Sequence, residues 1–144
     1  MSGETWNLLR HGEVVAVDTT TCCVKVHFEE LNDTSDWLPV LQIGGGGLAA
    51  YWLPSIGAVV VAVFFSDATE EGVVLGSLYT DEDNISDAGS GVYYVKFPDG
   101  SSVKWDNGAL EIIANSVDIT GGTTITGNVI VHGTVTAQHF IQEG

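Results

Sequence analysis

Hydrophobic and polar positions alternate along the C-terminal part of the chain, from Val117 to Ile141. Most odd positions are apolar and most even positions are polar, and successive side chains of an extended chain point to opposite faces. The pattern therefore predicts β-structure with one buried face. A six-residue repeat lies over it, because aliphatic-polar-glycine triplets begin at Ile119, Ile125 and Val131. The expected buried positions are Val117, Ile119, Ile125, Val129, Val131 and Val135.

A repeat this short cannot close a hydrophobic core within one chain, since stacked repeat units bury their apolar faces only against their neighbours. The missing neighbour must then be another chain. Three copies wound about one axis would also remove the exposed strand edges, which otherwise invite pairing. The repeat thus predicts a homotrimer.

The N-terminal part shows a different pattern, with short strand-like runs separated by segments rich in Asp, Thr, Gly and Ser. These runs and one long connection are typical of a small β-barrel of the OB type. The connection contains four consecutive glycines, Gly44 to Gly47. Neither a lysine nor a helix pattern accompanies them, which argues against a phosphate-binding loop and favours a flexible one. The expected strands are Glu13–Val17, Cys22–Phe28, Ala58–Phe65 and Val73–Leu78.

An acidic and polar segment, residues 81–91, has the composition of a linker and predicts a domain boundary. Turn sequences at Pro98-Asp99-Gly100 and at Asn107-Gly108 divide the chain beyond it into strands. These strands are expected at Val92–Phe97, Ser101–Asp106 and Ala109–Ala114. The expected organisation is an N-terminal arm over residues 1–8, an OB-fold domain over 9–80, the linker over 81–91 and a spike over 92–144.

The charge balance narrows the choice of partners. Four Lys and Arg residues oppose 19 Asp and Glu residues in a chain of 144, a formal net charge of -15. A surface that neutralises phosphates needs clustered cations, so nucleic acid is excluded as an expected partner. The acidity either keeps an assembly soluble or matches a basic partner surface.

We expect no membrane-spanning segment, no signal peptide, and no disulfide or metal site at the cysteines. The longest aliphatic and aromatic run, Ala58 to Phe65, is far shorter than the roughly 20 residues that a spanning helix needs. No basic and apolar leader precedes the first strand, so we expect no signal peptide. Cys22 and Cys23 are adjacent, so in a strand their side chains point to opposite faces and do not easily bridge each other.

Three stretches of the N-terminal part carry a family resemblance: Trp37-Leu38-Pro39, the run from Tyr51 to Val61, and the run from Glu71 to Tyr79. They resemble the baseplate assembly protein V family of contractile-tailed phages, which is related to the VgrG-type spikes of type VI secretion and to bacteriocin spikes. The string Gly-Val-Val-Leu-Gly-Ser-Leu-Tyr at 72–79 is the most specific part. The matching residues are Trp37, Pro39, Trp52, Pro54, Gly57, Gly72, Leu75, Gly76, Leu78 and Tyr79.

The resemblance implies an all-β chain, in which an N-terminal OB-fold barrel is followed by an intertwined triple-stranded β-helix in a homotrimeric needle. It implies a structural role without catalysis, as the central spike of a baseplate in the virion tail, assembled in the host cytoplasm. The implied partners are two further copies of the chain, the baseplate hub and the tail tube. Sheath contraction would drive the needle into the host outer membrane. A phage tail, a bacteriocin and a secretion apparatus are all compatible with the sequence.

The C-terminal end departs from the family pattern. Needles of this family often end in a His-x-His motif, through which three chains supply six nitrogens to one axial iron. This chain instead has His132 and His139, seven residues apart. By alternation, His132 falls on the outer face and His139 on the inner face, where three copies could hold an axial Fe or Zn ion or an anion. The alternatives are a histidine satisfied by hydrogen bonds or water, and a separate PAAR-type protein that caps the end.

Two other functions agree with parts of the sequence. The six-residue period resembles that of trimeric hexapeptide-repeat acyltransferases, with His132 as general base, although such folds wind many turns within each chain. The tryptophans at positions 6, 37, 52 and 105 would suit a carbohydrate-binding adhesin. We expect Trp37 and Trp52 to pack within the barrel instead, and no catalytic residue set stands out.

Overall fold

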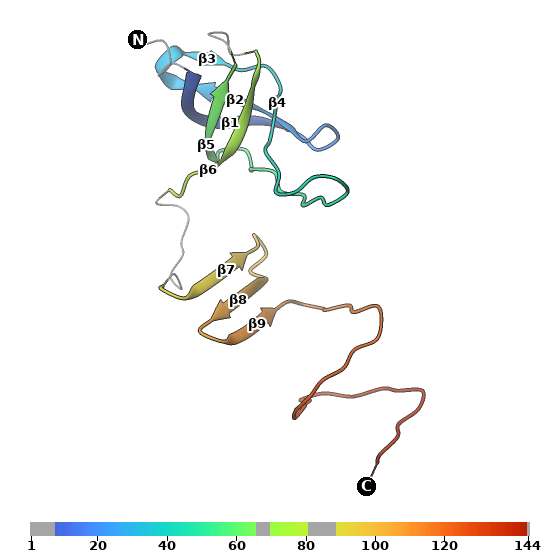
Figure 1. Ribbon diagram of the computed structural model, residues 1–144. Coiled ribbons are helices and arrows are strands. Elements are labelled where there is room, and N and C mark those ends of the chain that lie inside the picture. The colour runs from blue at the N-terminus through green and yellow to red at the C-terminus, as the bar shows by residue number, and fades with distance from the viewer. Residues whose placement is uncertain (1–7, 66–69, 81–88, 144) are drawn as a thin grey trace. The chain divides into compact units, whose positions relative to one another are not determined.

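The computed structural model describes residues 8–65, 70–80 and 89–143, and nearly all of its regular structure is strand (Figure 1). The described residues include a short 3-10 turn, η2 (Glu29–Leu31), and no helix among them has the length and apolarity needed to cross a membrane. The chain divides into two units, Met1–Ile85 and Ser86–Gly144. The predicted arm and most of the predicted linker, at 1–7 and 81–88, lie outside the described residues and stay predictions.

The strands of the N-terminal unit form one sheet that closes into a barrel (Figure 1). They pair in the order β3-β2-β1-β5-β6, and β4 also pairs with β2. Just beyond β4, Val40 forms a parallel bridge with Val74 of β6, and the Leu41 amide donates to the Val74 carbonyl oxygen at 2.8 Å. This contact closes the barrel in the manner of an OB fold. The strands are β1 (Leu9–Asp18), β2 (Cys23–Phe28), β3 (Asp33–Thr34), β4 (Leu38–Pro39), β5 (Val59–Phe64) and β6 (Gly72–Ser77).

The barrel core is built largely from valine. Along β2 and β5 every second residue is buried, as expected for strands that press one face against a core. The buried hydrophobic side chains come from β1, β2, β4, β5 and β6, so a single core joins these five strands. They are Val14, Val24, Val26, Phe28, Leu38, Val60, Ala62, Phe64 and Val74.

Two glycines let barrel strands approach each other closely. A Cβ atom added to Gly12 in β1 would lie 2.5 Å from the His27 carbonyl oxygen, and one added to Gly72 in β6 would lie 2.5 Å from that of Val63. Both separations are far below the optimal distance of non-bonded heavy atoms, and the obstacle is backbone rather than a mobile side chain. The barrel therefore requires glycine at both positions.

Two β-bulges bend the barrel strands. The register of β1 against β2 shifts between Val14 and Ala16, and the pairing of β5 with β6 passes over Leu75. A bulge leaves one extra residue unpaired and re-aims its side chain. Leu75, one of the residues of the family resemblance, is consequently 43% exposed and lies outside the core.

The C-terminal unit begins with an antiparallel meander of β7 (Val92–Lys96), β8 (Ser102–Asp106) and β9 (Ala109–Ile113), close to the predicted ranges. Asp99 holds the turn between β7 and β8. Its carboxylate accepts hydrogen bonds from the Ser101 amide and the Ser101 hydroxyl, both at 2.9 Å. These two bonds favour the ionised carboxylate and hold the pKa of Asp99 below its usual value.

Beyond β9, the described residues 114–143 form no strand within one copy of the chain (Figure 1). They form extended segments that bend at residues 115, 121, 127, 132–133 and 138. At two of these bends Gly121 and Gly127 take φ values of +128° and +131°, which residues with a Cβ rarely adopt. Two of the three repeat units thus share a backbone conformation at their glycine, whereas Gly133 of the third unit does not take a positive φ.

Candidate functional site

One face of the β7–β8–β9 sheet carries only apolar side chains. We call it the sheet face, and the strand register defines its two rows: Tyr93, Trp105 and Leu110, then Val95, Val103 and Ile112. Tyr93 is 75% exposed and Leu110 is 62% exposed. A contiguous apolar patch of this kind usually marks an interaction surface. Within one copy, the sheet face is largely open to solvent.

The opposite face of the same sheet carries its charged side chains, mixed with apolar ones such as Val92. Lys104 lies between Tyr94 and Glu111 in the register, and its Nζ lies 3.8 Å from the Asp106 carboxylate. Antiparallel sheets commonly bury one face and leave the other in water. The distribution of charge therefore identifies the sheet face as the one meant for burial.

The predicted core positions of the six-residue repeat are also exposed in one copy. We call these positions the repeat stripe: Val117, Ile119, Ile125, Val129, Val131 and Val135. Ile119 is 71% exposed and Ile125 is 63% exposed, while the four valines are 51–61% exposed. Burying a side chain of this size fully is worth about 1.5–3 kcal/mol, so the stripe represents a large stabilisation that a single copy leaves unused.

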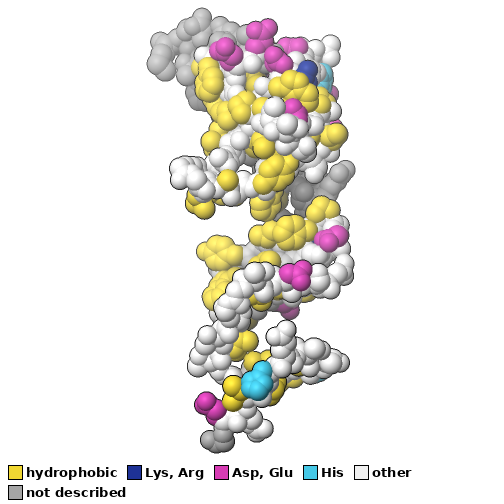
Figure 2. Space-filling view, turned by 90° about the vertical axis from the view of Figure 1, so that its right-hand side faces the viewer, with side chains coloured by type: hydrophobic (Ala, Val, Ile, Leu, Met, Phe, Trp, Pro, Cys, Tyr) yellow, Lys and Arg dark blue, Asp and Glu magenta, His cyan; other side chains and the backbone are white. Residues whose placement is uncertain are grey.

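The connection between β4 and β5, residues 40–58, is an apolar surface on the N-terminal unit. We call it the apolar loop. No Asp, Glu, Lys, Arg or His occurs from Trp37 to Ser66, although the chain as a whole is strongly acidic. Figure 2 shows acidic side chains of this unit gathered at one end and hydrophobic side chains reaching the other. The loop exposes six large hydrophobic side chains by 59–85%: Leu41, Ile43, Leu48, Tyr51, Trp52 and Ile56.

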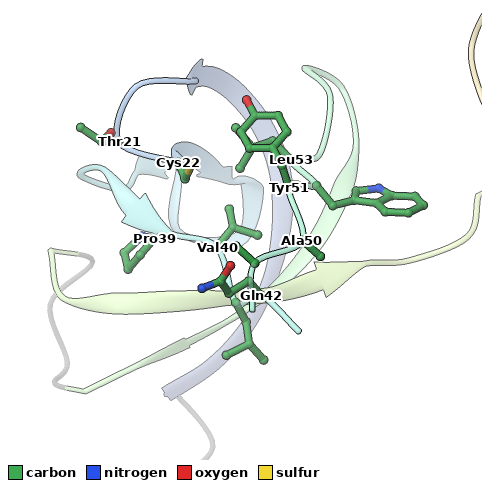
Figure 3. A pocket seen from close by; sticks show the side chains of 11 residues that line it. Thr21, Cys22, Pro39, Val40, Gln42, Ala50, Tyr51 and Leu53 are labelled. Carbon is green, nitrogen blue, oxygen red and sulfur yellow. The ribbon is translucent and has the colours of Figure 1, made fainter. Parts of the chain in front are cut away.

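A pocket of about 310 Å³ opens beside the apolar loop (Figure 3). Its walls are the turn at Thr21 and Cys22, the segment 39–42 and the segment 49–53. In Figure 3, Thr21 and Cys22 lie on one side of the pocket, and Tyr51 and Leu53 lie on the other. Most of the lining side chains are apolar, so the pocket suits an aliphatic or aromatic group rather than a charged one.

Asp18, at the end of β1, holds the turn that forms one wall of this pocket. Thr21 Oγ1 donates to Asp18 Oδ2 at 2.7 Å, and the Thr20 amide donates to Oδ1 at 2.9 Å. These hydrogen bonds hold the pKa of Asp18 below its usual value. Cys22 follows with a φ of +56° and lies outside β2, so its predicted place in that strand is wrong. Cys22 and Cys23 are both free thiols.

The two tryptophans that were expected to pack within the barrel do not behave alike. Trp37 is 41% exposed, and its ring lies 5.2 Å from the Lys25 Nζ, a cation–π contact. Trp52 is 68% exposed and lines the pocket. The prediction for Trp52 is therefore wrong, because the apolar loop carries the indole away from the core.

Both C-terminal histidines are exposed and lie at or beside bends of the repeat. In the part of the chain that the structure describes, no three His, Cys, Asp or Glu side chains are grouped so as to hold a metal ion. An axial ion at His139 needs three copies, so it stays a prediction. With one inner histidine per chain, the donor set on offer is three imidazoles rather than the six nitrogens of the family motif.

Comparisons with known proteins address both units. The model of a family described as the type VI secretion system/phage-baseplate injector OB domain matches residues 10–79, which is the barrel. The spike protein of Escherichia phage P2 is 22% identical to the chain over 123 residues. This similarity covers 85% of the chain and 57% of the phage protein, so the chain spans little more than half of that relative's length.

Proposed function

We propose that the chain is the central spike of a contractile-tail baseplate, because its barrel matches the injector OB-domain family of phage baseplates and type VI secretion systems. The 123 residues similar to a phage spike protein outnumber those of the barrel match, so the similarity reaches beyond the OB domain. The proposed role is structural and located in the virion tail. The acyltransferase and adhesin alternatives receive no comparable support.

The apolar surface of the C-terminal unit carries this proposal. The sheet face and the repeat stripe together contain twelve apolar side chains that follow one another along the chain, and eleven of them are exposed. Two further copies about a common axis would bury the stripes of all three chains in one core and pair the free backbone edges. The resulting assembly is a homotrimer with an intertwined triple-stranded β-helix over residues 92–144.

Such a shaft suits mechanical work, because its backbone hydrogen bonds run between chains and leave few edges to peel. In the proposed spike the barrels attach to the baseplate hub and the tail tube, and the shaft enters the host outer membrane when the sheath contracts. The polar face of the repeat is rich in threonine and nearly free of charge. Hydroxyl groups are far less costly to desolvate than charges, which favours passage through lipid.

Size-exclusion chromatography with light scattering tests the spike architecture. We expect a particle of three 15.2 kDa chains that resists SDS at room temperature, because separating intertwined chains requires unfolding all of them. A monomer would contradict the proposed architecture.

A further inference from the structure

We propose that the tip of the apolar loop of one copy packs into the pocket of the next copy, closing a ring of three barrels. The inference rests on the proposed trimer and adds a second contact, in the N-terminal unit. The tip comprises residues 43–48, and the pocket is the one between the Thr21–Cys22 turn and the segments 39–42 and 49–53.

The tip is a formed structure with its apolar side chains turned to solvent. The Leu48 amide donates to the Gly45 carbonyl oxygen at 3.2 Å, and Gly44, Gly46 and Gly47 take φ values between +61° and +111°. Glycine allows this tight turn, which residues with a Cβ would strain. Ile43 is 85% exposed and Leu48 is 68% exposed at the two ends of the turn.

The tip does not fill the pocket of its own chain. The residues on either side of it, Gln42 and Ala49, line the pocket, whereas Ile43 and Leu48 do not. Figure 1 shows the loop between β4 and β5 leading away from the barrel strands. The apolar loop therefore presents two different apolar surfaces, a projection and a hollow, which lie next to each other in one chain.

Charge identifies another copy of the chain as the occupant. Outside the apolar loop the surface of the N-terminal unit is strongly acidic, with Arg10 and Lys25 as the basic residues of positions 1–85. Two carboxylates brought close together near a protein surface repel each other. Like-charged barrels can therefore meet with least repulsion where charge is missing, which is the stretch from Trp37 to Ser66.

The geometry of a threefold ring requires the same pair of surfaces. In a cyclic trimer each interface is heterologous, so every copy offers one patch to one neighbour and a different patch to the other. The tip and the pocket meet this requirement, since both are apolar and free of charge. A single self-complementary patch would instead favour a twofold dimer.

The free thiol of Cys22, in the pocket wall, provides a direct test in the full-length chain. In a Cys23→Ser background, Ile43→Cys places a second thiol on the tip, and Leu48→Cys probes its other end. A disulfide needs Cβ atoms about 3.5–4.5 Å apart, so it reports close contact. After mild oxidation we expect disulfide-linked dimers and trimers on a denaturing gel, lost on reduction and lost in the added Cys22→Ser variant.

Leu31→Cys in the same background is the matched control, because Leu31 is exposed and lies in η2, beyond the other end of β2 from Cys22. If light scattering shows a trimer while both tip variants cross-link no more than this control, the inference is wrong and the proposed function stands. An intrachain disulfide, seen as a monomer without free thiols, would also overturn it. If light scattering shows a monomer, the proposed trimer fails and the inference fails with it.

Discussion

The rings of Phe28 and Phe64 meet edge to face inside the barrel, with their centroids 5.4 Å apart and their planes at 75°. Phe28 ends β2 and Phe64 ends β5, and β1 lies between these two strands in the sheet. The contact therefore links strands that share no backbone hydrogen bonds. Edge-to-face pairs of this kind add about 0.5–1.5 kcal/mol beyond the burial of the rings.

Phe64→Ala should destabilise the barrel by about 3–5 kcal/mol, because it removes a fully buried ring and leaves a cavity. The measurement is the urea midpoint of the barrel transition, followed by circular dichroism. Phe65→Ala is the matched control, since Phe65 is 71% exposed. It should change the free energy of unfolding by about 0.5 kcal/mol or less. Equal losses in the two variants would contradict the described core.

Gly72→Ala should lower the stability of the barrel by about 1–3 kcal/mol, because its new Cβ would collide with the Val63 carbonyl oxygen. Gly76→Ala, in the same strand, is the control. A Cβ added there meets nothing within 4 Å, so little change is expected. Thermal unfolding of both variants measures the difference, and a fully stable Gly72→Ala protein would show that β5 and β6 lie farther apart.

Ile125→Asp should abolish the SDS-resistant trimer, because three carboxylates would meet on the proposed axis. Thr126→Asp introduces the same charge one residue later, on the opposite face, and should leave the trimer intact. Gel mobility without heating and light scattering distinguish the two variants. A trimer lost in Thr126→Asp and kept in Ile125→Asp would reverse the assignment of the two faces.

The turn at Asp18 should lose stability in acid. Its hydrogen bonds to Thr21 and Thr20 lower the pKa of the folded carboxyl, so the stabilisation is present above the unfolded value near 3.8 and is lost as the pH falls through the lower folded value. Urea midpoints of the wild type and of Asp18→Asn should differ at pH 6 and converge as the pH falls below the folded pKa of Asp18. A difference that stays constant with pH would contradict this role of the carboxylate.

An axial metal at His139 is tested by elemental analysis of the purified trimer. The prediction is one Fe or Zn ion for three chains, lost in His139→Ala and kept in His132→Ala, because only His139 has the parity of the repeat stripe. A wild-type trimer free of metal would remove the prediction without affecting the spike.

Sequence periodicity located the long strands well, because their alternation is set by the face that packs on the core. β5 was expected at Ala58–Phe65 and spans Val59–Phe64. The start of β1 was missed, since its first residues are largely polar and the strand is extended there by its pairing with β5. The two-residue strands β3 and β4 exist only through their pairing with β2, so they leave no pattern of their own.

The candidate surfaces differ in how much of each can be predicted from the sequence. The repeat stripe follows from period and parity in the sequence alone, and its burial stays a prediction because one copy leaves it exposed. The sheet face cannot be predicted without the register of three strands. The apolar loop cannot be predicted without knowing which hydrophobic side chains lie outside the core. Hydrophobic residues are expected inside a protein by default, which is why the burial predicted for Trp52 is wrong. The missing charge from Trp37 to Ser66 was the available signal for the loop.

Because residues 114–143 form no strand in one copy, we expect the barrel to fold before the shaft forms. The barrel has its own core and can fold on a nascent chain, whereas the shaft of the proposed trimer would gain its hydrogen bonds only after three chains have met. Its formation should therefore speed up with protein concentration, while barrel folding should not. The trimer, once wound, would dissociate only by unwinding all three chains, which makes the shaft kinetically persistent.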